Sequence, residues 1–146
     1  MPSTQSRAQA TWKGDLGHGK GTVAPASGAF GELPITWAAR AERSHGVTSP
    51  EELIASAHAG CFAMAFSNML ATAGTPPTKL TVSAACTFET GVGGAKITTM
   101  ALEVSGQVPG LDQAKFQRIA DEAKLGCPVS QALKGNVEIT LKATLA

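Results

Sequence analysis

Apolar and small residues dominate the stretch from Ser49 to Ala73. Ser49 suits a helix N-cap, and Glu52 stands where it completes a capping box. Pro50 suits the first helical position, and Gly74 with the prolines after it ends the pattern. Because apolar or small residues occupy nearly every face, we expect one long central helix that is buried on all sides. The stretch is too polar for a membrane span, since it contains Ser56, His58, Ser67 and Asn68.

Strands are predicted on both sides of this helix by runs of alternating apolar and polar residues. Before it, two short strands flank a glycine-rich turn and form a hairpin, and a further short strand carries Arg40. After it, a long hairpin follows, and a strictly alternating strand ends the chain. The predicted strands are Ala8–Lys13, Gly21–Ala24, Thr36–Glu42, Lys79–Glu89, Lys96–Val108 and Val137–Leu145, and loops are predicted over Ser27–Pro34 and Ser44–Thr48.

Two shorter helices are predicted between the last two strands. Residues 111–124 repeat apolar side chains at helical spacing, with Asp112 in the first turn and Lys124 in the last. Pro128 starts a second, short helical segment directly after Cys127. The order of the elements predicts an α+β fold with antiparallel sheet rather than repeated βαβ units. A length of 146 residues without a long linker predicts a single domain over residues 1–146.

Composition narrows the possible functions. The net charge is +1 and 16% of the residues are charged, with no basic run, so nucleic acid is not an expected partner. The N-terminal residues lack the apolar core of a signal peptide, and no membrane span is expected, which predicts a cytoplasmic protein. No cysteine–histidine cluster suggests a metal site. Without a metal, nucleotide or flavin motif, no cofactor is expected, and any redox chemistry must use thiols.

Three cysteines, Cys61, Cys86 and Cys127, do not make a disulfide framework. Cys61 and Cys127 both follow a glycine and lie on or beside a helix. They are the natural pair for a thiol peroxidase, in which one thiolate reacts with peroxide and a second thiol attacks the sulfenic acid. The helix dipole would make Cys127 the more acidic thiol, whereas Cys61 in mid-helix needs an external cation. Cys86, in a strand among small residues, is interpreted as structural.

Other interpretations of Cys61 stay open on these residues alone. Free cysteine is among the most buried residue types, so Cys61 also fits a plain core position. His58 lies three residues earlier on the same helix face and suits a base for acyl transfer by a Cys61 nucleophile. A non-enzymatic thiol sensor, or a dimer that binds an apolar ligand, is a further alternative.

Three motifs follow one another along almost the whole chain: G-T-V from Gly21, T-S-P-E-E-L-I-A-S-A-H-A-G-C-F from Thr48, and G-C-P-V-S-Q-A-L from Gly126. Together they resemble the osmotically inducible protein C / organic hydroperoxide resistance (OsmC/Ohr) family. W-x-G-D followed by G-K-G-T-V near the N-terminus resembles its osmotically inducible protein C branch in particular. The resemblance implies an OsmC-like fold, with antiparallel sheets wrapped around a long central helix in an intertwined homodimer.

The same resemblance implies a cofactor-free, cysteine-based peroxidase that reduces organic hydroperoxides and hydrogen peroxide. Cys61 matches the peroxidatic cysteine and Cys127 the resolving cysteine. The two form a disulfide in the family's cycle, which is reduced by a dithiol, often a lipoyl group. Arg40 matches the arginine that stabilises the thiolate, with Arg43 close by, and Glu51 matches the glutamate that orients this arginine.

Helix geometry separates Glu51 from the thiol of its own chain. Ten residues of α-helix advance about 15 Å and leave the two side chains roughly 80° apart around the axis. We therefore expect that the Glu51 and Arg40 that serve a given Cys61 come from the partner subunit of the homodimer.

Overall fold

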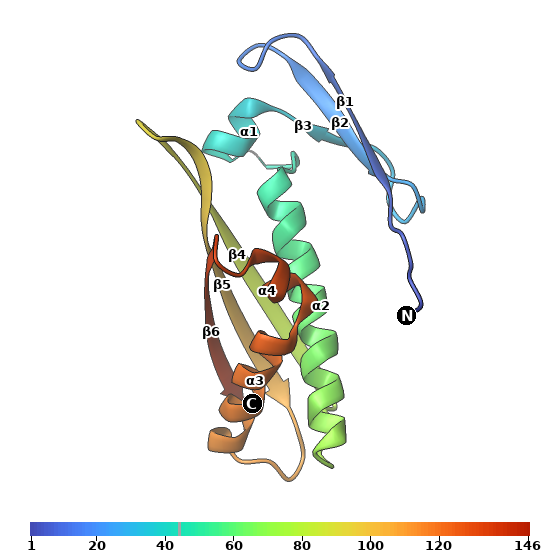
Figure 1. Ribbon diagram of the computed structural model, residues 1–146, viewed down its shortest axis with the longest axis vertical. Coiled ribbons are helices and arrows are strands. Elements are labelled where there is room, and N and C mark those ends of the chain that lie inside the picture. Colours follow the sequence, from blue (N-terminus) through green and yellow to red (C-terminus); the bar gives the residue numbers. More distant parts are fainter. Residues whose placement is uncertain (44) are drawn as a thin grey trace. The chain divides into compact units, whose positions relative to one another are not determined.

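The chain forms two units in the computed structural model, which describes residues 1–43 and 45–146. The first unit is Met1–Pro50 and the second is Glu51–Ala146, and Figure 1 traces their elements along the chain. Ser44, where the predicted loop before the long helix begins, lies outside the described residues.

The first unit is built on an antiparallel sheet with the strand order β1-β2-β3. The bounds are β1 Ala8–Lys13, β2 Lys20–Pro25 and β3 Leu33–Ile35. The predicted hairpin of β1 and β2 is confirmed, with Lys13 paired to Lys20 across the glycine-rich turn. The predicted loop over Ser27–Pro34 is wrong at its end, because Leu33 and Pro34 belong to β3 and pair with β2.

Residues that were predicted to form the strand Thr36–Glu42 form a helix instead, α1 (Trp37–Glu42). Thr36 is its N-cap, and the threonine hydroxyl accepts a hydrogen bond from the backbone N–H of Ala39 at 3.0 Å. The residues that follow are mostly alanine, arginine and glutamate, which favour helix. The threonine and tryptophan that favour a strand therefore mark the start of a helix.

The second unit begins with the long helix α2 (Pro50–Thr72), as predicted. Gly74, at φ 89°, ends it, and the backbone N–H of Thr75 donates to the carbonyl of Leu70 at 2.9 Å. One row of side chains at intervals of four residues is fully buried in the core. This row consists of His58, Phe62, Phe66 and Leu70.

The second sheet has the strand order β4-β5-β6, with β4 Lys79–Gly91, β5 Gly94–Gln107 and β6 Glu138–Leu145. The predicted long hairpin of β4 and β5 is confirmed as an antiparallel pair. The expectation of purely antiparallel sheet is wrong for β6, which pairs parallel to β5. Two helices, α3 (Gln113–Gly126) and α4 (Pro128–Leu133), connect these strands and return the chain to the starting end, as a parallel pair requires.

A single core fills the space between this sheet and its helices. Met100, Leu102 and Val104 of β5 are buried, whereas the residues between them face outward. The rings of Phe66 on α2 and Phe116 on α3 lie 5.0 Å apart, centroid to centroid. The helices thus cover one face of the second sheet (Figure 1). Two sheets and a long helix confirm the predicted α+β class.

In the single chain α2 is not buried on all sides, and the expectation that a second chain supplies the missing cover stays a prediction. An exposed row runs along it, and the Met64 side chain in this row is 72% exposed. By length and composition alone α2 would also suit a membrane span. A helix that packs one row of side chains into the core of its own unit can have the same length and apolar composition. The exposed row consists of Ala57, Gly60, Met64, Asn68 and Ala71.

Candidate active site

Two thiols that lie far apart in the sequence meet in the second unit. The Sγ atoms of Cys61, on α2, and Cys127, between α3 and α4, are hydrogen bonded at 3.1 Å. Both cysteines are free thiols, with Cys127 buried and Cys61 partly buried. A disulfide between them needs only a small further approach of the two sulfurs.

The backbone around Cys127 fixes the position of its thiol. Its N–H donates to the carbonyl of Ala123 in the last turn of α3, at 2.9 Å. Its own carbonyl accepts the N–H of Gln131 in α4, at 3.0 Å. Pro128 occupies the first turn of α4, where no N–H is required. Cys127 is therefore held from both sides at the junction of two helices.

The electrostatic surroundings of Cys61 oppose its ionisation. Burial raises the pKa of the Cys61 thiol, and the neighbouring Cys127 sulfur raises it further. The backbone N–H of Val129, in the first turn of α4, lowers this pKa by a hydrogen bond to the sulfur but does not offset the burial. The raised pKa of Cys61 agrees with the expectation that a thiol in the middle of a helix needs an external cation to ionise.

A second contact joins α2 and α4 beside the two sulfurs. His58 Nε2 and Ser130 Oγ are hydrogen bonded at 2.7 Å. The His58 side chain is 0% exposed and Ser130 is 5% exposed. Burial lowers the pKa of His58, so the imidazole is neutral at pH 7. Among the described residues, His58 Nδ1 has no hydrogen-bond partner.

Glu51 lies near the start of α2 and is 5% exposed. The pKa of Cys86 on β4 is raised mainly by burial and, to a smaller extent, by the negative charge of Glu51. Cys86 belongs to the alternate residues of β4 that pack against the core. Cys86 is thus a partly buried thiol packed against the core, which agrees with the structural role expected from the sequence.

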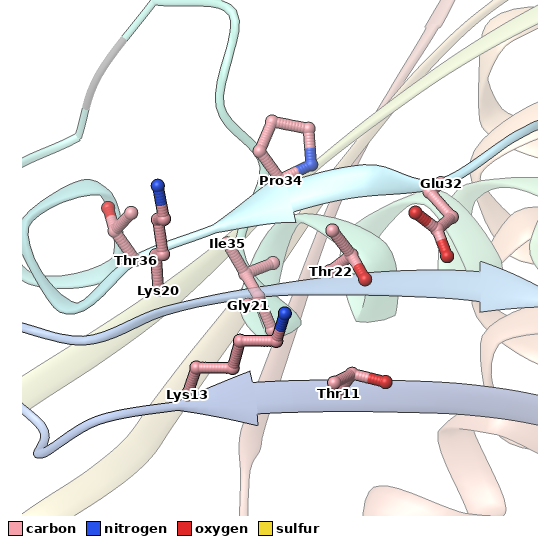
Figure 2. Close-up of a pocket in the computed structure, with 9 residues that line it drawn as sticks. All are labelled: Thr11, Lys13, Lys20, Gly21, Thr22, Glu32, Pro34, Ile35 and Thr36. Atoms are coloured by element: carbon pink, nitrogen blue, oxygen red, sulfur yellow. The ribbon is translucent and has the colours of Figure 1, made fainter.

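The first unit contains a hollow of about 410 Å³ over its sheet, and Figure 2 shows the side chains that line it. Two ammonium groups and one carboxylate contribute to its wall, and no thiol does. The lining residues are Thr11, Lys13, Lys20, Gly21, Thr22, Glu32, Pro34, Ile35 and Thr36. All three cysteines of the chain lie in the second unit.

Residues 43–142 match the family of OsmC-like proteins. The chain belongs to the OsmC family. Peroxiredoxin OsmC of Escherichia coli strain K12 is 46% identical over 135 residues, which cover 92% of each chain. An organic hydroperoxide resistance protein of Xanthomonas axonopodis pv. citri is 33% identical over 97 residues, 64% of this chain and 65% of that protein. The resemblance inferred from the sequence motifs is confirmed.

The fold of this OsmC-family chain is also that of solved structures. The crystal structure of the organic hydroperoxide resistance protein OhrB of Bacillus subtilis has a TM-score of 0.74 at 25% identity, over 94% of this chain and 98% of that chain. The organic hydroperoxide resistance protein of Elizabethkingia anophelis, crystallised with thiocyanate bound, has a TM-score of 0.77 at 23% identity, over 99% and 100%. The OsmC-like fold implied by the motifs is therefore confirmed.

The four site residues predicted for this OsmC-family chain divide between the two units. Cys61 and Cys127 are in contact within the second unit. Glu51 is in the same unit, ten residues before Cys61 on α2. Arg40 is on α1 in the first unit, so its part in the site stays a prediction.

Sequence reasoning did not single out Ser130, and it considered His58 either as a base or as a buried or interface histidine. The signal was present in the spacing, because His58 precedes Cys61 by three residues and Ser130 follows Cys127 by three. His58 shares a face of α2 with Cys61, and Ser130 lies in the first turn of α4 behind its N-cap Cys127, so a contact between the cysteines favours one between the other two residues.

Proposed function

We propose that this chain is a cysteine-based thiol peroxidase that reduces organic hydroperoxides to alcohols, and hydrogen peroxide to water, without a cofactor. The observation that carries the proposal is the 3.1 Å contact between the Cys61 and Cys127 sulfurs. The names of the two relatives, a peroxiredoxin and an organic hydroperoxide resistance protein, support the same activity.

The cycle needs no atom beyond these two thiols, a hydroperoxide and a dithiol. The Cys61 thiolate attacks the terminal peroxide oxygen, the O–O bond breaks, and the alkoxide takes a proton and leaves as the alcohol. Cys61 then carries a sulfenic acid. The Cys127 sulfur attacks this sulfur, the S–S bond forms, and hydroxide leaves as water with the Cys127 proton. Thiol–disulfide exchange with a dithiol, which we propose to be of lipoyl type, restores both thiols.

Arg40 is the proposed source of the charge that keeps Cys61 ionised, and Glu51 the residue that orients it. The raised pKa of Cys61 supports the need for a cation at this sulfur. Of the two candidate arginines, Arg43 donates from its Nη1 to the Ala39 carbonyl at 3.0 Å and so helps to end α1. This structural role of Arg43 favours Arg40 as the residue that faces the thiolate.

A homodimer with shared active sites is the proposed assembly. The exposed row of small and apolar residues on α2 supports a second copy of this helix as its cover. All six residues of β1 are exposed, and Ala39 is the one fully buried hydrophobic residue in the described part of the first unit. So small a core supports the idea that residues 1–146 fold as one domain only against a partner subunit. We place this dimer in the cytoplasm, where the thiols are kept reduced.

The test is turnover of cumene hydroperoxide with dihydrolipoamide as reductant. Wild type turns over, and Cys61→Ser loses the activity. Cys127→Ser consumes one equivalent and then stops, with a sulfenic acid on Cys61 that dimedone traps. Cys86→Ser is the matched control and retains wild-type turnover. Peroxide consumption by Cys61→Ser at the wild-type rate would overturn the proposal. A wild type that is oxidised once but not turned over by any dithiol would indicate a thiol sensor instead.

A further inference from the structure

Two side-chain contacts, not one, join α2 to α4. Cys61 meets Cys127 at 3.1 Å, and one helical turn away His58 meets Ser130 at 2.7 Å. Residues three apart on a helix lie on one face, about 4.5 Å apart along the axis. The hydrogen bond therefore lies one turn from Cys61 along α2 and in the first turn of α4, which Cys127 caps.

The His58–Ser130 hydrogen bond occupies a buried position where an apolar contact would stabilise the fold more. Its two partners are His58 and Ser130, both almost completely shielded from water. His58 Nδ1 is buried without a partner among the described residues, which costs stability that an apolar side chain of similar size would not. A purely structural role does not account for an imidazole at this position. We therefore relate the contact to the pair of cysteines beside it.

The short helix α4 needs such a contact to keep its place. It has six residues, too few to be stable without tertiary packing. Cys127 is its N-cap, so a shift of α4 along α2 would move the Cys127 sulfur away from Cys61. Disulfide formation tolerates only a narrow range of separations and angles, so small shifts slow it strongly.

We propose that the His58–Ser130 hydrogen bond is a positioning device for the resolving step, which holds Cys127 in reach of the Cys61 sulfenic acid. The proposal rests on the peroxidase function proposed above. His58 and Ser130 are positioning residues, because they act through the placement of α4 and not on the peroxide. Because the imidazole is neutral, this hydrogen bond places no charge in its buried surroundings.

The proposal separates the two chemical steps. Cys127 takes no part in the attack of Cys61 on peroxide, so loss of the hydrogen bond changes the second-order rate constant of this attack much less than it changes the lifetime of the sulfenic acid. Resolution slows, the sulfenic acid lives longer, and a second peroxide oxidises it to sulfinic acid at lower peroxide concentration. In steady state, kcat and the KM for peroxide fall together, while kcat/KM for peroxide changes much less than kcat.

The experiment is single-turnover stopped flow on the reduced full-length protein with cumene hydroperoxide, followed by mass spectrometry of Cys61. Ser130→Ala and His58→Leu are each expected to prolong the sulfenic acid about tenfold, the effect of one lost hydrogen bond. Ser130→Thr keeps the hydroxyl and is expected to restore the lifetime. The double variant is expected to add nothing to either single variant, because both remove the same contact.

Ser56→Ala is the matched control, since the Ser56 hydroxyl is exposed on the same helix and bonds only locally to the Glu52 carbonyl at 2.9 Å. It should match wild type in both steps. An unchanged sulfenic acid lifetime in Ser130→Ala and in His58→Leu would overturn the positioning role while the peroxidase proposal stands. An equal loss in both chemical steps would overturn it too, in favour of a general defect. A wild type that forms no sulfenic acid would instead remove the peroxidase proposal itself.

Discussion

The sulfur atoms of Cys61 and Cys127 lie 3.1 Å apart, although 66 residues separate the two cysteines in the chain. A long helix presents one sulfur and the junction of two short helices presents the other. Since both belong to one packed unit, disulfide formation needs no large rearrangement of the fold.

Loss of the Arg40 guanidinium should leave Cys61 with the raised pKa that burial gives it. The Arg40→Ala variant is expected to react with hydroperoxide about 10- to 100-fold more slowly at pH 7, because the thiolate fraction falls. Below the pKa, its rate should rise about tenfold per pH unit. Arg43→Ala serves as the control and should keep the wild-type pH profile. The measurement is the second-order rate constant of peroxide reduction from pH 6 to 10; identical profiles for Arg40→Ala and wild type would exclude Arg40.

A mixed dimer distinguishes a shared site from one built within a single chain. Homodimers of Cys61→Ser and of Arg40→Ala are both expected to be inactive or strongly impaired. When the two chains are combined, one site in each mixed dimer regains an intact Cys61 and Arg40 of the partner subunit. Activity should then return to about half that of wild type per mixed dimer. Mixed dimers as inactive as their parents would show that both residues act within one chain.

Cys86 should remain a spectator of the redox cycle. Burial and the Glu51 charge both raise its pKa, so its thiolate is scarce at neutral pH. We expect iodoacetamide to label Cys86 in the native protein much more slowly than in the unfolded protein at pH 7.5. Cys86→Val should retain wild-type turnover. Rapid labelling of Cys86, or its appearance in a disulfide after one turnover, would contradict this.

The buried His58 should make the protein less stable at acid pH. Its pKa is lowered in the folded state, so the unfolded chain binds more protons than the folded chain once the pH falls below about 6.5. The free energy of unfolding is expected to fall by up to about 1.4 kcal/mol per pH unit, until the folded-state pKa is passed. Urea unfolding of wild type and His58→Leu between pH 7.5 and 4.5 measures this term, which the variant should lack.

The control for this titration is His45→Gln, because the His45 side chain is exposed. It should keep the pH dependence of wild type. A His58→Leu variant with the same pH dependence as wild type would show that His58 is not the group responsible.

Local signals in the sequence predict most of the elements. The helix α2 and the strand β6 are both confirmed, because the signals that predict them depend only on neighbouring residues. The segment Thr36–Glu42 was misassigned because the same threonine that favours a strand also caps a helix. The direction of β6 was missed because alternation shows which face is buried but not which way the neighbouring strand runs.

The candidate site was likewise predicted only in part, because local sequence signals identify some of its residues but not the contacts between distant ones. The motifs identify Cys61 and Cys127, and the fold brings them together. The sequence predicts that the N-terminus of α4 favours the thiolate of Cys127. In the structure the backbone N–H of Val129, in the first turn of α4, is hydrogen bonded to the Cys61 sulfur instead. This orientation depends on how α4 packs on α2. The contact of Ser130 with His58 spans 72 residues, and no local pattern contains it.

The most direct measurement is a mass map of the cysteines after the reduced protein has received one equivalent of cumene hydroperoxide. We expect one cumyl alcohol per chain, a disulfide that joins Cys61 to Cys127, and Cys86 recovered as a free thiol. Consumption of the peroxide with Cys61 and Cys127 both recovered as free thiols, or with Cys86 in the disulfide, would contradict this expectation.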